Sequence, residues 1–204
     1  PAARSPINMA RSRAVSLNVV QAARARSEAP QAAAGFDIGM LIRMVRQNIG
    51  TLVLATLLRG DWVRAAIAMD LHNARWPRDL LGLQVGHLLD FFRGNARDLR
   101  DRIARALPGW APGVPGYGVV LGMYAFGLEE CGDYGRAEEM GRRAVDIEPR
   151  DAWAHHAVAH VMEMQGRAQD GIGWMAVREP HWTGDDNFFK VHNWWHRALY
   201  HLEL

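Results

Sequence analysis

The chain has 204 residues and a hydrophobic fraction of 49%, which is enough for one domain or one elongated array with a buried core. The formal net charge is only +2, and Lys190 is the only lysine, so the use of arginine indicates a coding bias rather than a nucleic-acid surface, and nucleic acid is not an expected partner. The single cysteine, Cys131, excludes an internal disulfide and fits a reducing, cytoplasmic compartment. The apolar run from Ile49 to Leu58 is too short to cross a bilayer, so no membrane association is expected.

In chain order, the first segment differs from the rest. Residues 1–46 carry seven arginines against Glu28 and Asp37. Residues 9–26 have the apolar spacing of an amphipathic helix, and the Pro- and Ala-containing stretch 28–35 is typical of a linker. We therefore expect residues 1–35 to form an N-terminal basic helix and linker, separate from the remainder.

Residues 36–204 are expected to be helical throughout, because no stretch alternates apolar and polar residues long enough to indicate a sheet. Proline, glycine and capping residues divide this part into short helices. The predicted helices are 37–58, 61–75, 79–93, 96–107, 117–131, 133–147, 151–165, 168–178 and 187–203.

Four glycines recur between these helices at a nearly fixed interval. Gly60, Gly94, Gly132 and Gly166 are separated by 34, 38 and 34 residues. A period near 34 residues built from two helices is typical of tetratricopeptide repeats. Each glycine is expected to end the first helix of a hairpin, where a left-handed backbone is needed. The fold class predicted is therefore all-α, an α-solenoid of tetratricopeptide-like hairpins.

The pattern is stronger at twice that interval, which indicates a duplicated pair of hairpins. Several residues besides the glycines recur after 72 positions: Pro77-Arg78-Asp79 as Pro149-Arg150-Asp151, Asp98 as Asp170, Pro108 as Pro180 and Trp110 as Trp182. The prolines at 77 and 149 are expected to end helices, and the aspartates that come after them are expected to cap the next ones.

Two later segments carry chemistry that a repeat scaffold does not require. His156 and His160 lie four residues apart, so they share one helix face, and Glu163 falls on the same face. His192 and His196 form a second pair with the same spacing. Since the first helix of each hairpin lines the concave side of such arrays, we expect these five side chains to converge in a groove.

The neighbouring first helices supply the rest of the expected groove. Its predicted ligand-binding residues are Gln84, Phe126, Glu129, Glu130, Trp153 and Trp195. Three interpretations of the histidines and Glu163 remain open. They are a divalent metal site, a general acid–base site, or hydrogen-bonded structural groups between stacked helices. The usual zinc helix motif is absent, because Ala157 rather than glutamate follows His156.

The chain also resembles the tetratricopeptide repeat protein 38 family. The resemblance lies in residues 121–130, 151–166 and 192–196, with the stretch 80–92 similar to an upstream part, and covers about residues 50–204. It implies an all-α repeat fold, and it supplies no settled activity. Family members are considerably longer, so the chain is expected to be a central portion, truncated at its C-terminal end.

The function predicted from the sequence is a repeat scaffold that binds a peptide, a protein segment or a small polar ligand in a His- and Glu-lined groove. The alternative is an acid–base or metal-assisted enzyme, hydrolase-like, that uses the same His and Glu residues. A divalent metal is the candidate cofactor. Self-association is a further expectation, because an array without a polar terminal repeat leaves an apolar end.

Overall fold

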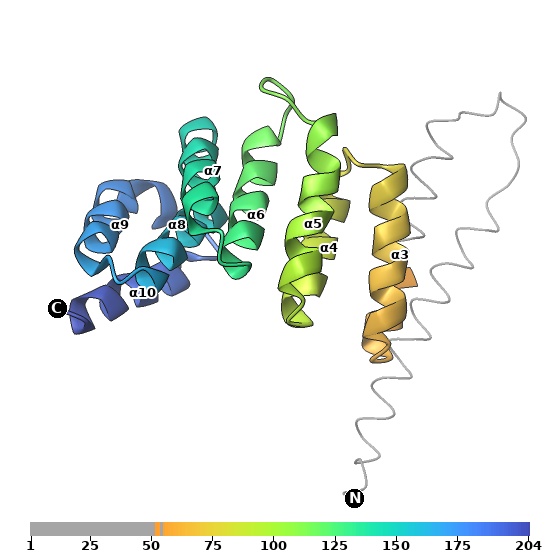
Figure 1. Ribbon diagram of the computed structural model, residues 1–204, viewed down its shortest axis with the longest axis horizontal. Coiled ribbons are helices and arrows are strands. Elements are labelled where there is room, and N and C mark those ends of the chain that lie inside the picture. Colours follow the sequence, from red (N-terminus) through yellow and green to blue (C-terminus); the bar gives the residue numbers. More distant parts are fainter. Residues whose placement is uncertain (1–51, 54) are drawn as a thin grey trace, which may run out of the picture.

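The computed structural model describes residues 52–53 and 55–204 (Figure 1). Within that part of the chain every regular element is a helix, and a helical stretch at 52–53 and 55–58 comes first. The later helices are α3 (Trp62–Arg75), α4 (Leu80–Phe92), α5 (Ala96–Ala106), the 3₁₀ turn η1 (Leu107–Gly109), α6 (Tyr117–Glu130), α7 (Tyr134–Ile147), α8 (Ala152–Met164), α9 (Ala168–Trp182) and α10 (Lys190–Leu202). The predicted basic segment 1–35 lies outside the described residues.

The helices pack in sequence order along the long axis of the molecule, from α3 to α10 (Figure 1). Each helix contacts the next one in the chain, and α4, α6, α8 and α10 also contact one another in succession. These alternate helices therefore form one continuous layer, as in a helical repeat fold. None of the helices in the described part is both long enough and apolar enough to cross a membrane.

The four periodic glycines have the conformation that the sequence predicts. Gly60, Gly94, Gly132 and Gly166 have φ of +78°, +66°, +77° and +65°, and each is the second residue after the last helical residue of a first helix. A side chain at these positions would strain the backbone, because L-residues seldom adopt positive φ. The predicted hairpin register is therefore confirmed at every one of these turns.

Aspartates occupy the N-cap positions of α3, α4, α7 and α8, and three of these four make a capping hydrogen bond. The carboxylates of Asp61, Asp79 and Asp151 each accept hydrogen bonds from backbone N–H groups in the first turn of the adjoining helix. Asp133 occupies the N-cap of α7 but makes no such bond. The prediction that aspartates cap the helices after the periodic prolines, at 79 and 151, is confirmed.

The two copies diverge at their tryptophans. The Trp110 indole donates to the Pro77 carbonyl oxygen over 2.9 Å. In the second copy the His155 Nε2 lies 2.8 Å from the equivalent carbonyl oxygen of Pro149. Trp182 is fully buried, and its indole nitrogen has no hydrogen-bond partner among the described residues. A histidine has therefore replaced the tryptophan at this contact.

The end of α9 differs from the prediction. A helix over 168–178 was expected to stop before Pro180, but α9 continues to Trp182 with Pro180 inside it. The ring removes one backbone donor, and the helix nevertheless continues, because Trp182 is buried against the Trp194 ring at a centroid distance of 5.3 Å. The Thr183 backbone N–H and hydroxyl both bond the carbonyl oxygen of Glu179 and close the last turn.

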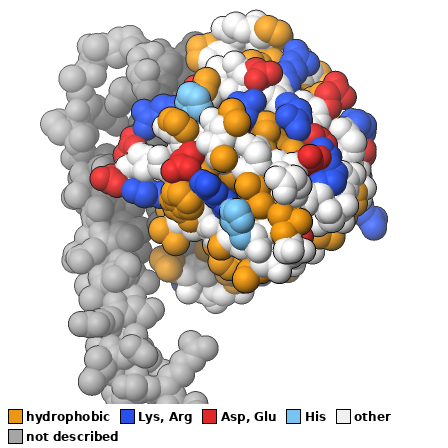
Figure 2. Space-filling view, turned by 90° about the vertical axis from the view of Figure 1, so that its left-hand side faces the viewer, with side chains coloured by type: hydrophobic (Ala, Val, Ile, Leu, Met, Phe, Trp, Pro, Cys, Tyr) orange, Lys and Arg blue, Asp and Glu red, His pale blue; other side chains and the backbone are white. Residues whose placement is uncertain are grey.

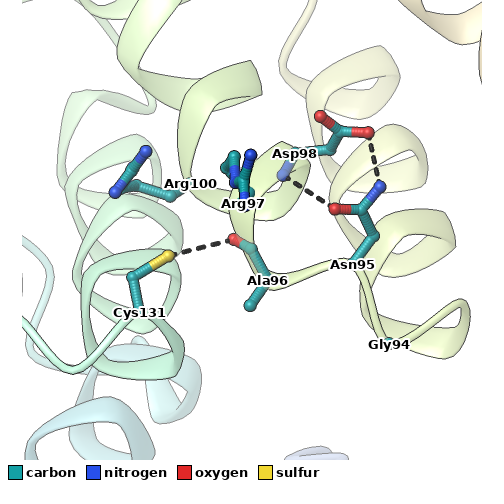
Figure 3. Close-up of a pocket in the computed structure, with 7 residues that line it drawn as sticks. All are labelled: Gly94, Asn95, Ala96, Arg97, Asp98, Arg100 and Cys131. Carbon is teal, nitrogen blue, oxygen red and sulfur yellow. Dashed lines mark hydrogen bonds between the residues drawn. The ribbon is translucent and has the colours of Figure 1, made fainter.

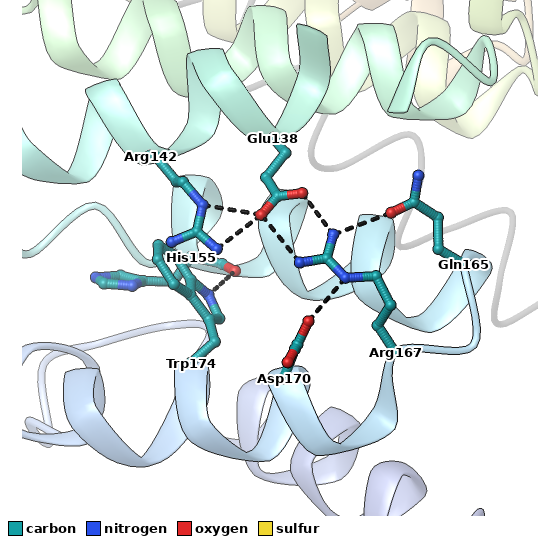
Figure 4. A network of polar contacts seen from close by, with 7 residues as sticks. All are labelled: Glu138, Arg142, His155, Gln165, Arg167, Asp170 and Trp174. Carbon is teal, nitrogen blue, oxygen red and sulfur yellow. Dashed lines mark hydrogen bonds and ion pairs between the residues drawn. The ribbon is translucent and has the colours of Figure 1, made fainter. Parts of the chain in front are cut away.

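A polar network joins α7 to the start of α9 (Figure 4). The Glu138 carboxylate accepts hydrogen bonds from Arg142 over 2.7 Å and from Arg167 over 2.6 Å, while Arg167 also bonds Asp170. The bond from Arg167 is the main reason that the pKa of Glu138 lies below its usual value, followed in the same direction by the bond from Arg142. The network fixes the hairpin formed by α8 and α9 against the one before it.

Candidate metal centre and adjoining cavity

The two histidine pairs meet where α8 packs against α10. On each helix the spacing of four residues places both rings on one face, and the two faces are turned toward each other. His156, His160, His192 and His196 each offer a ring nitrogen such that all four atoms lie within 4.8 Å of one another. The prediction that these side chains converge is confirmed. We call these four residues the histidine cluster.

The Nε2 atom of His192 has more close nitrogen neighbours than hydrogen bonding alone explains. The Nε2 atom of His192 lies 2.9 Å from Nε2 of His156 and 3.1 Å from Nε2 of His196. A neutral imidazole nitrogen carries either one proton or one in-plane lone pair, so Nε2 of His192 can form one good hydrogen bond, not two. A cation shared by the three nitrogens would satisfy all of them at once.

Two carboxylates support the cluster from behind. Glu163 accepts a hydrogen bond from Nδ1 of His196 over 2.8 Å, which leaves Nε2 of that ring with its lone pair directed at the other histidines. Nδ1 of His160 lies 3.6 Å from a carboxylate oxygen of Glu129, which is itself almost fully buried. Carboxylates that orient histidines through the second ring nitrogen are the usual support of a metal site.

Burial lowers the pKa of three of the four histidines. His156 is 3% exposed, and burial, with further contributions from the other three histidines, holds its pKa well below the ordinary value. The pKa of His196 falls to about 3, chiefly through burial, and that of His192 is lowered by the partial burial of its ring and by His160. Burial also raises the pKa of Glu163. Neutral imidazoles have the free lone pair that a metal ion requires.

The donor set fits a first-row transition metal. Zinc binds imidazole nitrogen at about 2.0–2.1 Å, so tetrahedral ligands lie about 3.3 Å apart. The separations of His192 from His156 and His196, 2.9 and 3.1 Å, are close to this value, and the four nitrogens lie within 4.8 Å of one another. Imidazole also suits copper, nickel and iron, whereas magnesium and calcium prefer oxygen ligands. All four histidines can contribute a ligand, with Glu163 and Glu129 as their supports.

The histidine cluster forms one wall of an apolar cavity of about 880 Å³ between α4, α6, α8 and α10. The cavity is lined by Leu88, Phe91, Phe92, Phe126, Trp153, His156, His160, Phe188, Phe189, Val191, His192 and Trp195. Its only polar side chains apart from the tryptophans are histidines. A volume of this size suits a small organic molecule.

The residues predicted to line the groove divide into three groups. Phe126, Trp153 and Trp195 line the cavity. Glu129 lies behind it next to His160, and Glu130 is exposed at the end of α6 with a pKa raised by partial burial and by Glu129. Gln84 is half-buried on α4 and does not line the cavity.

Two aromatic residues that precede α10 were not predicted from the sequence. The Phe189 ring lies 4.7 Å from the Trp153 ring and 5.1 Å from the His156 ring, between centroids, and Phe188 is almost fully exposed at the edge of the cavity. Phe189 could have been predicted from the sequence, because Phe189, His192 and His196 have the three- and four-residue spacing of one helix face. The chain between α9 and α10 brings Phe188 and Phe189 to the cavity.

A second cavity, of about 610 Å³, lies at the start of α5 and has a different character (Figure 3). Asn95 caps α5 and donates to Asp98 over 2.6 Å, while the Cys131 thiol donates to the carbonyl oxygen of Ala96 over 3.3 Å. The polar groups of Asn95, Asp98 and Cys131 are thus already engaged in hydrogen bonds within the protein. Cys131 is the C-cap residue of α6, and its thiol is engaged in this hydrogen bond.

A comparison with models of known protein families finds none that matches the chain. The function must therefore be inferred from the geometry of the histidine cluster and the cavity.

Proposed function

We propose that the chain is a metal-binding helical repeat protein, with one transition-metal ion held by His156, His160, His192 and His196. The observation that carries the proposal is the convergence of four ring nitrogens within 4.8 Å from two facing helices. The lowered pKa of the buried His156 ring and the carboxylate of Glu163 hydrogen-bonded to His196 support it. A bound ion would act as a Lewis acid toward a molecule in the cavity, which is the metal-assisted alternative for the function.

The lining of the cavity favours this alternative over a peptide-binding scaffold. Peptide grooves of repeat proteins need donors for the backbone and the carboxylates of the ligand, which arginine and asparagine normally supply. Neither residue lines this cavity. An acid–base site is also less well supported, because the pKa values of His156, His192 and His196 are shifted downward, away from the neutral range that general acid–base catalysis uses.

The fold proposed for this function is a tetratricopeptide-type α-solenoid. The glycine turns with positive φ and the successive packing of α4, α6, α8 and α10 support it. The resemblance to the tetratricopeptide repeat protein 38 family remains part of the proposal. We infer a cytoplasmic location from the use of a single, unpaired cysteine.

The test is metal binding by the whole chain. Titration with Zn²⁺, Co²⁺ or Cu²⁺ is expected to saturate at one ion per chain. His192→Ala should weaken binding by at least about tenfold, because it removes a ligand. His192 is exposed, so the substitution leaves the helical core intact.

His201→Ala is the matched control, since His201 lies on the same helix, is exposed and stands outside the cluster. Its affinity for metal should equal that of the unchanged chain. Metal binding that His192→Ala leaves unaltered would contradict the proposal. So would a His160→Ala protein that loses thermal stability while the unchanged chain binds no metal, because the histidines would then be structural.

A further inference from the structure

We propose that the cavity binds a planar aromatic molecule carrying one neutral donor atom, a ring nitrogen or a carbonyl oxygen, which coordinates the metal ion. This inference rests on the proposed metal site and specifies what that site recognises.

The cavity selects against charged ligands. No lysine, arginine, aspartate or glutamate lines it. A phosphate or a nucleotide would lose its hydration without gaining a charged partner, which is costly in an apolar surrounding. Two carboxylates, Glu163 and Glu129, already lie next to the histidine cluster and offset the charge of a divalent ion. A neutral donor is therefore favoured over an anionic one.

Aromatic rings surround the part of the histidine cluster that faces the cavity. The His156 ring lies 5.4 Å from the Phe126 ring and 5.1 Å from the Phe189 ring, between centroids. The Trp195 ring stacks on His192 at 5.4 Å with an angle of 23° between the planes. Aromatic surfaces in this arrangement favour a flat, aromatic body through stacked and edge-to-face contacts.

The histidines place the metal ion next to the cavity, so that one molecule can coordinate the ion with its donor atom while its aromatic body occupies the cavity. His156, His160 and His192 line the cavity, whereas His196 does not and is held from behind by Glu163. An ion among the four nitrogens would therefore face the cavity on one side. Ions such as zinc expand from four ligands to five, so a donor atom from the cavity can be added to the histidines.

The experiment uses the Co²⁺-loaded chain, whose visible absorption reports the ligands of the ion directly. The probe is 4-phenylimidazole, which carries a nitrogen donor on an aromatic body. Imidazole supplies the donor alone, and toluene supplies the aromatic body alone. We expect 4-phenylimidazole to change the cobalt spectrum and to bind at least about tenfold more tightly than imidazole, because the cavity buries its phenyl ring. Toluene should shift the tryptophan emission by making the surroundings of Trp153 and Trp195 less polar, without changing the cobalt spectrum.

A pair of double variants tests whether the cavity is responsible. Phe92→Ala/Phe188→Ala removes two exposed rings from the edge of the cavity, and these rings contact the neighbouring rings of Phe91 and Phe189. Leu81→Ala/Val177→Ala is the control, because these side chains are similarly exposed but lie outside the cavity. The first variant should lower the preference for 4-phenylimidazole over imidazole several-fold with unchanged cobalt content, and the second should preserve it.

The outcomes separate this inference from the proposed function. Failure to bind cobalt would overturn both. Cobalt binding with equal affinity for imidazole and 4-phenylimidazole, or with no spectral change for either, would overturn the inference and leave the metal site intact. Equal loss of preference in both double variants would also overturn it, because the phenyl ring would then bind elsewhere.

Discussion

The carboxylate of Asp151 caps α8, the helix that carries two of the metal-site histidines, and it is also buried. The capping bonds favour its charged form, whereas burial favours its neutral form. Its Oδ1 accepts hydrogen bonds from the backbone N–H groups of Trp153 and Ala154, while Oδ2 has no hydrogen-bond partner among the described residues. Burial raises its pKa from 3.8 to about 7, and the two backbone bonds oppose that shift only in part. The folded chain therefore retains this proton to a higher pH than the unfolded chain does.

The sign of the pH dependence comes from that difference. The stability that the proton on Asp151 contributes is complete below pH 3.8 and is lost as the pH rises toward about 7. Asp151→Asn keeps an N-cap acceptor and removes the charge. We expect the variant to be more stable than the unchanged chain above pH 7, by about 2–4 kcal/mol. The gain should vanish near pH 4.

Urea unfolding of both proteins across this pH range measures the effect. Buried neutral histidines such as His87 and His155, with pKa values of about 3 and 4, destabilise the fold as the pH falls below 6.5, but they do so equally in both proteins. The difference between the two curves therefore isolates Asp151. Asp133→Asn, at an N-cap without a capping bond, is the control. A difference that does not change with pH would refute the assignment.

At the scale of helices, the close approach of α9 and α10 depends on Gly171. A Cβ at this position would lie within 2.6 Å of several ring atoms of Tyr200, which is itself fully buried and donates its hydroxyl hydrogen to the Ala159 carbonyl oxygen. Gly171→Ala is therefore expected to destabilise the chain by about 1–3 kcal/mol through overpacking. Since Tyr200 lies on the helix that carries His192 and His196, the affinity for metal should fall as well.

The neighbouring Gly173→Ala provides the matched control for this prediction. It is exposed on the same helix, and its added Cβ would meet nothing within 4 Å. Alanine is favoured over glycine in helices, so the control should be neutral or slightly stabilising, by up to about 1 kcal/mol. Chemical denaturation of the two variants decides the question, and equal stabilities would show that α10 can move away from Gly171 at no cost.

The same helices mark the limit of what the sequence predicts. Helical periodicity places His156 and His160 on one face, and the closing Gly166 fixes which way that face points. The helix with His192 and His196 has no such glycine to set its register. Which of its faces is turned toward α8 therefore depends on the packing of α10 on α8. The extent of α9 is also beyond local rules, because burial of Trp182 outweighs the effect of Pro180.

The aromatic cavity is predicted least well, since it is assembled from four helices that are distant in sequence. Phe126, Trp153 and Trp195 are recognisable from the repeat register. Phe92 lies at the end of α4 and Phe188 outside any helix, so neither can be placed from helical spacing. Their positions depend on how one hairpin stacks on the next, which is a property of the tertiary structure.

At the scale of the whole molecule, the end formed by α9 and α10 exposes several large apolar side chains among charged ones. Val177 is 80% exposed, Leu202 82% and Trp194 39%, and hydrophobic side chains lie between charged ones on this surface (Figure 2). Repeat arrays normally cover such an end with a polar terminal helix, because exposed apolar groups favour association. We therefore expect the chain to self-associate through this end.

Sedimentation velocity over a wide range of concentrations measures the association. The sedimentation coefficient should rise with concentration for the unchanged chain, and Leu202→Glu/Val177→Glu should suppress the rise by placing charge in the contact. Leu58→Glu/Val63→Glu is the control, since both side chains are exposed at the opposite end of the described array. A monomer that persists at all concentrations would refute the prediction. If the control suppresses association more than the test variant does, the contact lies at the N-terminal side of the array and the prediction is wrong.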